Sequence, residues 1–194
     1  MKRVLILLVL VTLIAVPTSA DYDPETDYMA LMMQAAQTGD VAAGETAAVR
    51  RAEKITAQEL EYTPVDFEEL YLLSKIIYAE AGSVWLPMDW KMAVGEVVLN
   101  RMASPEFPDS MREVLEQPGQ YYGKNSRYFN NLKPSAECVE AAKRLLEGAR
   151  VLGQPAVVFQ SNYRLGSGVY LELKDKYLGS TYLCWSSFPE LYET

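Results

Sequence analysis

The spacing of apolar residues changes near Gly153, and this change constrains the fold more than any other feature of the chain. Before residue 153, apolar side chains recur at intervals of three and four, which is typical of helices that bury one face. After it, the short segments 156–161, 169–173 and 181–186 are separated by turn residues, which is typical of strands. Several helices followed by a small antiparallel sheet predict an α+β fold.

Six segments have helical spacing together with capping or helix-ending residues: 28–37, 47–60, 66–82, 87–103, 109–117 and 134–149. The stretch 120–133, which is rich in Tyr and Asn, is expected to be a loop. Gly95 lies inside the fourth of the predicted helices, where a glycine costs stability. It therefore predicts close packing against another helix.

The chain is expected to have three parts. Residues 1–20 are predicted to be a secretory signal, with a positively charged start, an apolar core at 4–16 and small residues before Asp21. An uncleaved N-terminal anchor is the alternative. Residues 21–62 are predicted to form a helical N-terminal extension, and residues 63–194 the main domain. The mature protein is expected to act outside the cytoplasm, engaging the membrane only during export.

The composition excludes several classes of function. The chain contains no histidine, which removes Ser-His-Asp and Cys-His catalysis and the common zinc sites. No metal or organic cofactor is therefore expected. The net charge is −8, and loss of the first 20 residues leaves 16 basic against 26 acidic side chains. Nucleic acid and anionic membrane surfaces would repel such a protein. Cys138 and Cys184 are the two cysteines, and a disulfide or two buried thiols are both open.

The helix predicted at 66–82 carries a glutamate, Glu80, on its apolar side. Burial and the negative end of the helix dipole both disfavour the charged form, so the pKa of Glu80 is expected to be raised. A carboxylic acid that stays protonated near neutral pH is a general acid. The competing interpretation is a solvated glutamate or an ion pair with Lys75 or Lys91.

Two stretches are distinctive: YAEAG at 78–82 and VGEVVLNRMASPEFPDSMREVLEQPGQYY at 94–122. They resemble the SleB-like cell wall hydrolases, the catalytic domain of spore-cortex-lytic enzymes. The resemblance runs from about Phe67 to Trp185. It implies a lysozyme-like fold for the main domain, peptidoglycan glycan strands as the partner, and cleavage of the MurNAc–GlcNAc bond by a lytic transglycosylase. The catalytic glutamate of the family's YAEA-type motif corresponds to Glu80.

The sequence departs from the family pattern in two places. Residues 83–89 form a longer stretch than usual between the two motifs, which is expected to reshape the rim of the cleft. Where the family often has Gly-Asn-His, residues 179–181 read GST, so any role of that histidine is lost. No wall-binding repeat module is recognisable. The lost motif supports a rival hypothesis, a noncatalytic wall-binding or spore-structural protein that keeps the fold.

Glycosidic cleavage agrees with the absence of histidine, because it requires only acids. A hydrolase that uses water needs two carboxylates about 5–10 Å apart. A lytic transglycosylase needs one, because the C6 hydroxyl of the sugar is a tethered nucleophile. Glu96 is the candidate second carboxylate, although a solvated or Arg101-paired residue is the preferred interpretation. A water-using muramidase or glucosaminidase is the alternative enzyme.

Two clusters of amides and aromatic rings are candidate substrate-binding residues, since sugars stack on rings and hydrogen-bond to amides. Their members are Gln117, Gln120, Tyr121, Tyr122, Gln160 and Asn162. For each tyrosine, half-buried packing is the alternative. The sequence leaves open the oligomeric state and the choice between spore cortex and vegetative wall.

Overall fold

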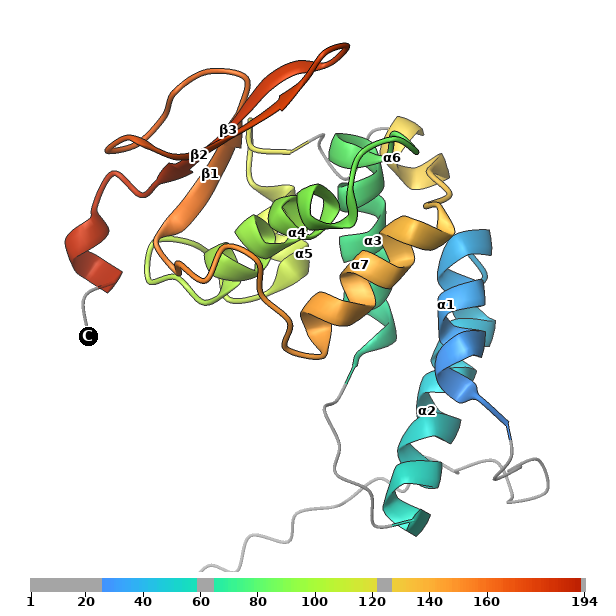
Figure 1. The fold of residues 1–194 in the computed structure, drawn as a ribbon. Coiled ribbons are helices and arrows are strands. Elements are labelled where there is room, and N and C mark those ends of the chain that lie inside the picture. Colours follow the sequence, from blue (N-terminus) through green and yellow to red (C-terminus); the bar gives the residue numbers. More distant parts are fainter. Residues whose placement is uncertain (1–25, 59–64, 122–126, 193–194) are drawn as a thin grey trace, which may run out of the picture.

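The computed structural model describes residues 26–58, 65–121 and 127–192. The predicted signal at 1–20, the predicted boundary between residues 62 and 63, and Tyr122 lie outside the described residues. The α-helices come first along the chain, and the three strands and a short 3₁₀ helix follow them, as Figure 1 shows, which confirms the α+β class. No helix among the described residues is long and apolar enough to cross a bilayer.

The elements are α1 (Tyr28–Thr38), α2 (Val41–Gln58), α3 (Phe67–Ala81), α4 (Met88–Met102), α5 (Met111–Glu116), α6 (Arg127–Asn131), α7 (Ala136–Leu146), β1 (Val157–Ser161), β2 (Val169–Asp175), β3 (Gly179–Trp185) and the 3₁₀ helix η2 (Pro189–Tyr192).

Helix α3 forms where the sequence predicts a helix, because its start and its buried face are both encoded locally. Asp66 caps it, and the Oδ1 atom of Asp66 accepts a hydrogen bond from the Glu69 backbone N–H at 3.0 Å. Four apolar side chains on the inner face are completely buried: Leu70, Leu73, Ile76 and Ile77. Glu80 follows them in the last turn of the helix.

Helices α3, α4 and α7 pack against one another at the centre of the protein. Gly95 makes this possible. A Cβ atom at position 95 would lie 2.5 Å from Leu145 Cδ1 of α7 and 2.8 Å from Ile77 Cδ1 of α3. The glycine therefore allows three helices to approach closely, as its position in the sequence predicted.

Helices α1 and α2 lie side by side and pack on α3 and α7 (Figure 1). Their buried residues belong to the same core as those of α3. Helix α2 begins at Val41, six residues before the predicted start, because Asp40 caps it by accepting a hydrogen bond from the Ala43 backbone N–H. Gly44 lies inside the helix, and a Cβ there would lie 2.0 Å from Phe67 Cζ, so the glycine allows α3 to approach closely.

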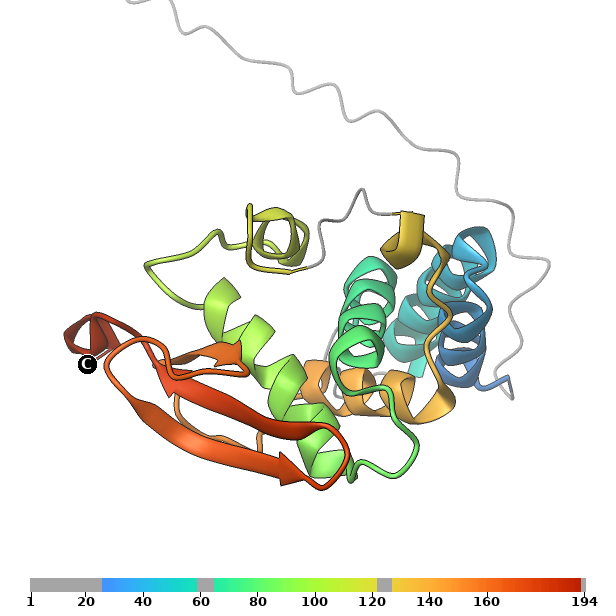
Figure 2. The same cartoon turned by 90° about the horizontal axis from the view of Figure 1, so that it is seen from above.

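The three strands form one antiparallel sheet in the order β1-β3-β2. Figure 2 shows the sheet lying along α4. The inner face packs on that helix, since Val157 of β1 and Leu183 of β3 share a buried cluster with Ala93 and Val97 of α4. The sheet thereby brings the end of β1 toward the helical core.

Two segments differ from the prediction near α7. The expected loop at 120–133 contains the short helix α6, which buries Phe129. Helix α7 ends at Leu146 instead of continuing to residue 149, because Gly148 takes a positive φ of 101° just after it. In both segments, polar residues make the sequence signal for a short helix, or for the end of a helix, difficult to recognise.

Cys138 on α7 and Cys184 on β3 are free thiols, and both are completely buried. Of the two alternatives that the sequence left open, the structure contains the buried thiols. Each thiol fills space in the interior as a small apolar side chain.

Candidate active site

Glu80 lies in the last turn of α3, partly buried and partly accessible to solvent. The predicted alternative of an ion pair with Lys75 or Lys91 is wrong. Lys75 Nζ donates to the carbonyl oxygen of Asn130 at 3.2 Å. Lys91 Nζ donates to the carbonyl oxygens that precede α4 and forms an ion pair with Glu137. Glu80 is left without either cation.

Burial raises the pKa of Glu80 above its ordinary value of 4.5, as the sequence predicted. The carboxyl group therefore retains its proton at a higher pH than an exposed glutamate does. Partial exposure keeps it within reach of a ligand. A protonated, accessible carboxyl group is the property that a general acid needs.

Gln160 of β1 is the side chain that contacts Glu80 directly. Its Nε2 atom donates to Glu80 Oε2 at 3.4 Å, a long hydrogen bond. Its Oε1 atom is buried and has no hydrogen-bond partner in the part of the chain that the structure describes. The Oε1 atom of Gln117, which follows α5, is likewise buried and unpaired. An unpaired buried acceptor costs about 1–3 kcal/mol, and a hydroxyl group of a bound ligand would satisfy each one.

Arg101 of α4 lies among aromatic rings beside this contact. Its Cζ atom lies 4.9 Å from the ring centroid of Phe107, 5.0 Å from that of Tyr121 and 5.7 Å from that of Phe159. Its Nε donates to the carbonyl oxygen of Val158 at 2.6 Å, while its Nη1 is buried and has no partner within residues 26–58, 65–121 and 127–192. The guanidinium group thereby orders the rings by cation–π contacts and retains a free donor.

Tyr121 couples this arginine to the carboxyl group. Burial raises the pKa of the Tyr121 hydroxyl, the charge of Arg101 lowers it, and the charge of Glu80 raises it. The three side chains therefore share one electrostatic environment. Together with Gln160 they form a cluster, called here the Glu80 cluster, that draws on α3, α4, β1 and the turn after α5.

Arg101 was not among the predicted site residues. The signal that could have identified it is the one that identified Glu80, a charged side chain on the apolar stripe of a helix. Arg101 is 3% exposed, at a position where the spacing of α4 calls for an apolar residue. From the sequence, Arg101 was instead interpreted as a possible partner for Glu96.

Glu96 lies in the interior and away from solvent, at 1% exposure. Its Oε2 atom accepts hydrogen bonds from the backbone N–H groups of Val151 at 2.6 Å and Leu152 at 2.9 Å, and its Oε1 from that of Gly153 at 3.0 Å. The interpretation as a solvated or Arg101-paired residue is wrong. Glu96 fixes the connection between α7 and β1, and its buried carboxylate is not accessible to a substrate.

The other described binding residues that were predicted lie close in sequence to Tyr121 or Gln160. Gln117 is half-buried, and Gln120 is exposed next to Tyr121. Asn162 is exposed two residues after Gln160. These residues remain predicted substrate contacts.

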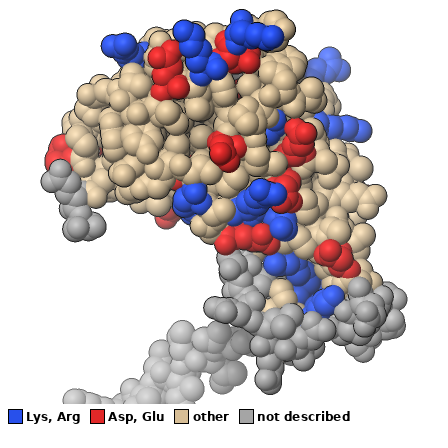
Figure 3. Space-filling view, viewed as in Figure 1, with Lys and Arg blue, Asp and Glu red and all other residues tan. Residues whose placement is uncertain are grey.

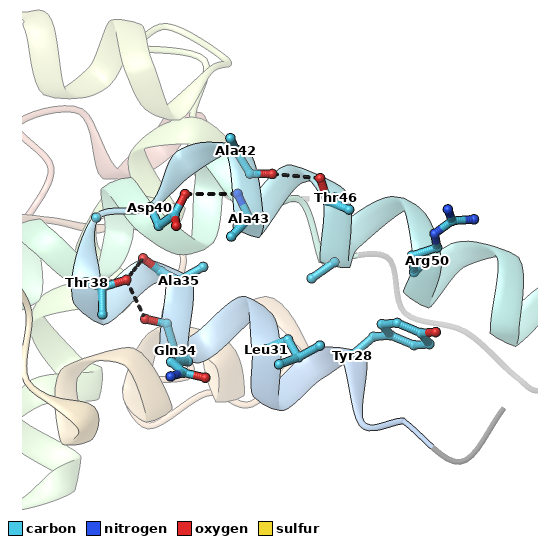
Figure 4. A pocket seen from close by; sticks show the side chains of 12 residues that line it. Tyr28, Leu31, Gln34, Ala35, Thr38, Asp40, Ala42, Ala43, Thr46 and Arg50 are labelled. Carbon is cyan, nitrogen blue, oxygen red and sulfur yellow. Dashed lines mark hydrogen bonds between the residues drawn. The ribbon is translucent and has the colours of Figure 1, made fainter. Parts of the chain in front are cut away.

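The described surface also has two pockets. One, of about 1230 Å³, lies between α1 and α2 (Figure 4). The other, of about 590 Å³, lies between α2, α3, α5 and α6. Neither includes a residue of the Glu80 cluster. On the face shown in Figure 3, acidic and basic side chains are interspersed, so this face has no patch of a single charge.

The fold and the cluster together define a class, an α+β protein with an accessible carboxyl group whose pKa is raised by burial. Residues 87–174 match the model of the family described as Cell Wall Hydrolase. This match confirms the resemblance to the SleB-like cell wall hydrolases and supports a hydrolase that acts on the cell wall, with peptidoglycan as its substrate. No curated protein and no solved structure matches the chain.

The matched range contains Arg101, Tyr121 and Gln160 but begins after Glu80. The assignment of Glu80 therefore rests on the YAEA-type motif and on the geometry described above.

Proposed function

We propose that the protein is an exported lytic transglycosylase that cleaves the MurNAc–GlcNAc bond of peptidoglycan, with Glu80 as general acid and then general base. The observation that supports this proposal most directly is the position of Glu80. It is an accessible carboxyl group with a raised pKa, and it touches an amide whose other end is buried and unpaired.

The reaction needs one carboxyl group. Protonated Glu80 donates its proton to the glycosidic oxygen as the bond from that oxygen to the anomeric carbon breaks. The resulting carboxylate then accepts the proton of the C6 hydroxyl on the same sugar. The C6 oxygen bonds to the anomeric carbon and closes a 1,6-anhydro ring, so Glu80 ends as it began. The nucleophile is already tethered, and no water is consumed.

The location of Glu96 favours this mechanism over one that uses water. A water-using hydrolase needs a second accessible carboxylate about 5–10 Å from the first. Glu96, the candidate for that role, uses both carboxylate oxygens on backbone N–H groups in the interior. Gln160 holds the Glu80 carboxyl group in place, and Arg101 holds Tyr121 beside it. Gln117, Gln120, Tyr121, Tyr122, Gln160 and Asn162 are proposed to contact the glycan.

Export is proposed from the sequence of residues 1–20, which has the charged start, apolar core and small residues of a secretory signal. The wall or the spore would then be the place of action.

The test is digestion of isolated walls and spore cortex by protein that lacks residues 1–20. Wild-type protein is expected to release muropeptides with anhydro ends, one water molecule lighter than reducing-ended products. Glu80→Gln is expected to abolish release and leave the circular dichroism unchanged. Glu69→Gln on the same helix is the matched control and is expected to stay active. Activity of Glu80→Gln at the wild-type level would exclude Glu80 from the mechanism.

The same experiment separates the two alternatives. Reducing-ended products alone would identify a water-using muramidase or glucosaminidase. Binding to walls without release of fragments would identify a noncatalytic wall-binding or spore-structural protein, the function that the sequence GST at 179–181 supports.

A further inference from the structure

The smaller of the two pockets, of about 590 Å³, has the features of a ligand site that the proposed reaction does not use. Five of its ten lining residues are apolar or aromatic, with Phe67, Tyr71, Leu72 and Phe129 among them. Lys75 of α3 also lines it, so the pocket is called the Lys75 pocket below.

Lys75 is unusual because its ammonium group is enclosed without a carboxylate. The residue is 3% exposed. Among the described residues, its Nζ atom makes one hydrogen bond, to the carbonyl oxygen of Asn130. The same atom lies 4.8 Å from the ring centroid of Tyr71 and 4.7 Å from that of Phe129. No ion pair joins it to any residue in the described part of the chain.

An ammonium group has three N–H donors, and only one is used here. A buried charge without a counter-ion is costly, and burial lowers the pKa of Lys75 accordingly. Two aromatic faces offset part of that cost. An anion that entered the pocket would satisfy the remaining donors and restore the full charge.

The other charges of the pocket decide which anion fits. Glu45, Glu68 and Arg112 also line it, and Arg112 forms an ion pair with Glu68. With Lys75 included, the lining carries two positive and two negative side chains. The two carboxylates would repel a phosphate dianion more strongly than a singly charged carboxylate.

We propose that the Lys75 pocket binds a small carboxylate with an apolar body. The ligand carboxylate accepts hydrogen bonds from Lys75 Nζ, and its apolar part packs against Phe67, Tyr71 and Phe129. The site is independent of the Glu80 cluster, so this proposal does not depend on the proposed transglycosylase activity. A free acid and the C-terminus of a peptide carry the same carboxylate.

Calorimetric titration with 3-phenylpropionate tests the proposal, with 3-phenylpropionamide and phenyl phosphate as comparisons. Glycyl-phenylalanine and its C-terminal amide form the arm that separates a peptide source from a free acid. The acid is expected to bind at millimolar concentration, as is ordinary for a ligand of this size, and roughly tenfold more tightly than the uncharged amide. Lys75→Met is expected to lose that preference, whereas Lys176→Met, at an exposed lysine, keeps it.

Acylation of the wild-type protein provides a second readout, which does not require a variant to fold. The protein is treated with acetic anhydride, and mass spectrometry measures modification at each lysine. 3-Phenylpropionate is expected to reduce modification of Lys75 and leave Lys176 unchanged. Equal binding of the acid and the amide, tight binding of phenyl phosphate alone, or no protection of Lys75 at about 10 mM acid would overturn the proposal.

Discussion

Gln160 Nε2 lies 3.4 Å from Glu80 Oε2, and this contact joins side chains 80 positions apart in the chain. Two opposing effects on the pKa of Glu80 operate at this contact. A hydrogen bond to the carboxylate favours its charged form, whereas burial favours the protonated form. Burial prevails, because the pKa of Glu80 is raised. Loss of the Gln160 donor is therefore expected to raise the pKa of Glu80 further, and the contact orients the carboxyl group.

Replacement of Gln160 by methionine keeps the length of the side chain and removes the donor. The pKa of Glu80 is expected to rise further, so the alkaline limb of the pH–rate profile moves to higher pH. The maximal rate is expected to fall about two- to tenfold, as for the loss of one hydrogen bond of about 0.5–1.5 kcal/mol. Release of dye from labelled walls across a pH series measures both effects. Gln154→Met, at an exposed glutamine, is the control, and an unshifted profile for Gln160→Met would contradict this role.

The raised pKa of Glu80 also predicts how stability depends on pH. The folded protein holds the Glu80 proton more tightly than the unfolded chain, where the pKa is near its ordinary 4.5. The contribution to stability is therefore complete below that value and is lost as the pH rises through the folded-state pKa. Glu80→Gln cannot ionise and does not suffer this loss.

Urea unfolding of wild type and Glu80→Gln at several pH values checks the prediction. The difference in unfolding free energy is expected to be smallest near pH 4 and to grow in favour of the variant toward about pH 8. Glu190→Gln, at an exposed glutamate, serves as the comparison. A difference that stays constant with pH would mean that burial does not perturb the Glu80 carboxyl group.

Glu96 is expected to matter for stability and not for the chemical step. Glu96→Gln removes the charge and turns an NH₂ group toward backbone N–H donors that now bond to the carboxylate. The free energy of unfolding should fall by about 2–4 kcal/mol, since hydrogen bonds to charged groups are each worth about 1.5–3 kcal/mol. Denaturant titration measures this loss, with the exposed Glu190→Gln as control. A stable Glu96→Gln protein without activity would restore Glu96 as a catalytic candidate.

Much of the fold was predictable because its signals are local. The Asp66 cap and the apolar stripe of α3 lie within one segment, and they also place Glu80. The alternation after Gly153 likewise placed the three strands within a few residues of their observed bounds. Gln160 was selected as an amide at a strand end, and it does lie at the end of β1 beside Glu80.

The remaining features depend on contacts between distant segments, which one sequence does not reveal. The three amides that bind Glu96 come from residues 55 to 57 positions further along the chain. Arg101 owes its role to rings on three different segments and to a carbonyl group on β1. A helical wheel shows that a charge faces inward, but the identity of its partner follows only from the packing of α4 against β1.

Gly95→Ala is expected to destabilise the protein, although alanine in an ordinary helix is more favourable than glycine by up to about 1 kcal/mol. The added methyl group would overlap Leu145 and Ile77, which are at most 1% exposed and have little room to move. Overpacking of this kind costs about 1–3 kcal/mol. Urea unfolding should therefore show a net loss of up to about 2 kcal/mol after the gain in helix propensity is included.

Leu145→Ala supplies the matched background, because it removes the nearer of the two obstructing side chains. Alone it should cost about 2–5 kcal/mol, but Gly95→Ala added to it should cost less than in wild type or become stabilising. Costs that add within about 0.5 kcal/mol would show that the methyl group does not meet Leu145. Ile77 remains in place in the double variant.

Gly95→Ala should also lower wall-cleaving activity, even at temperatures where the variant is fully folded. Ile77 lies one turn before Glu80, so contact between the new methyl group and Ile77 displaces the end of α3 that carries the carboxyl group.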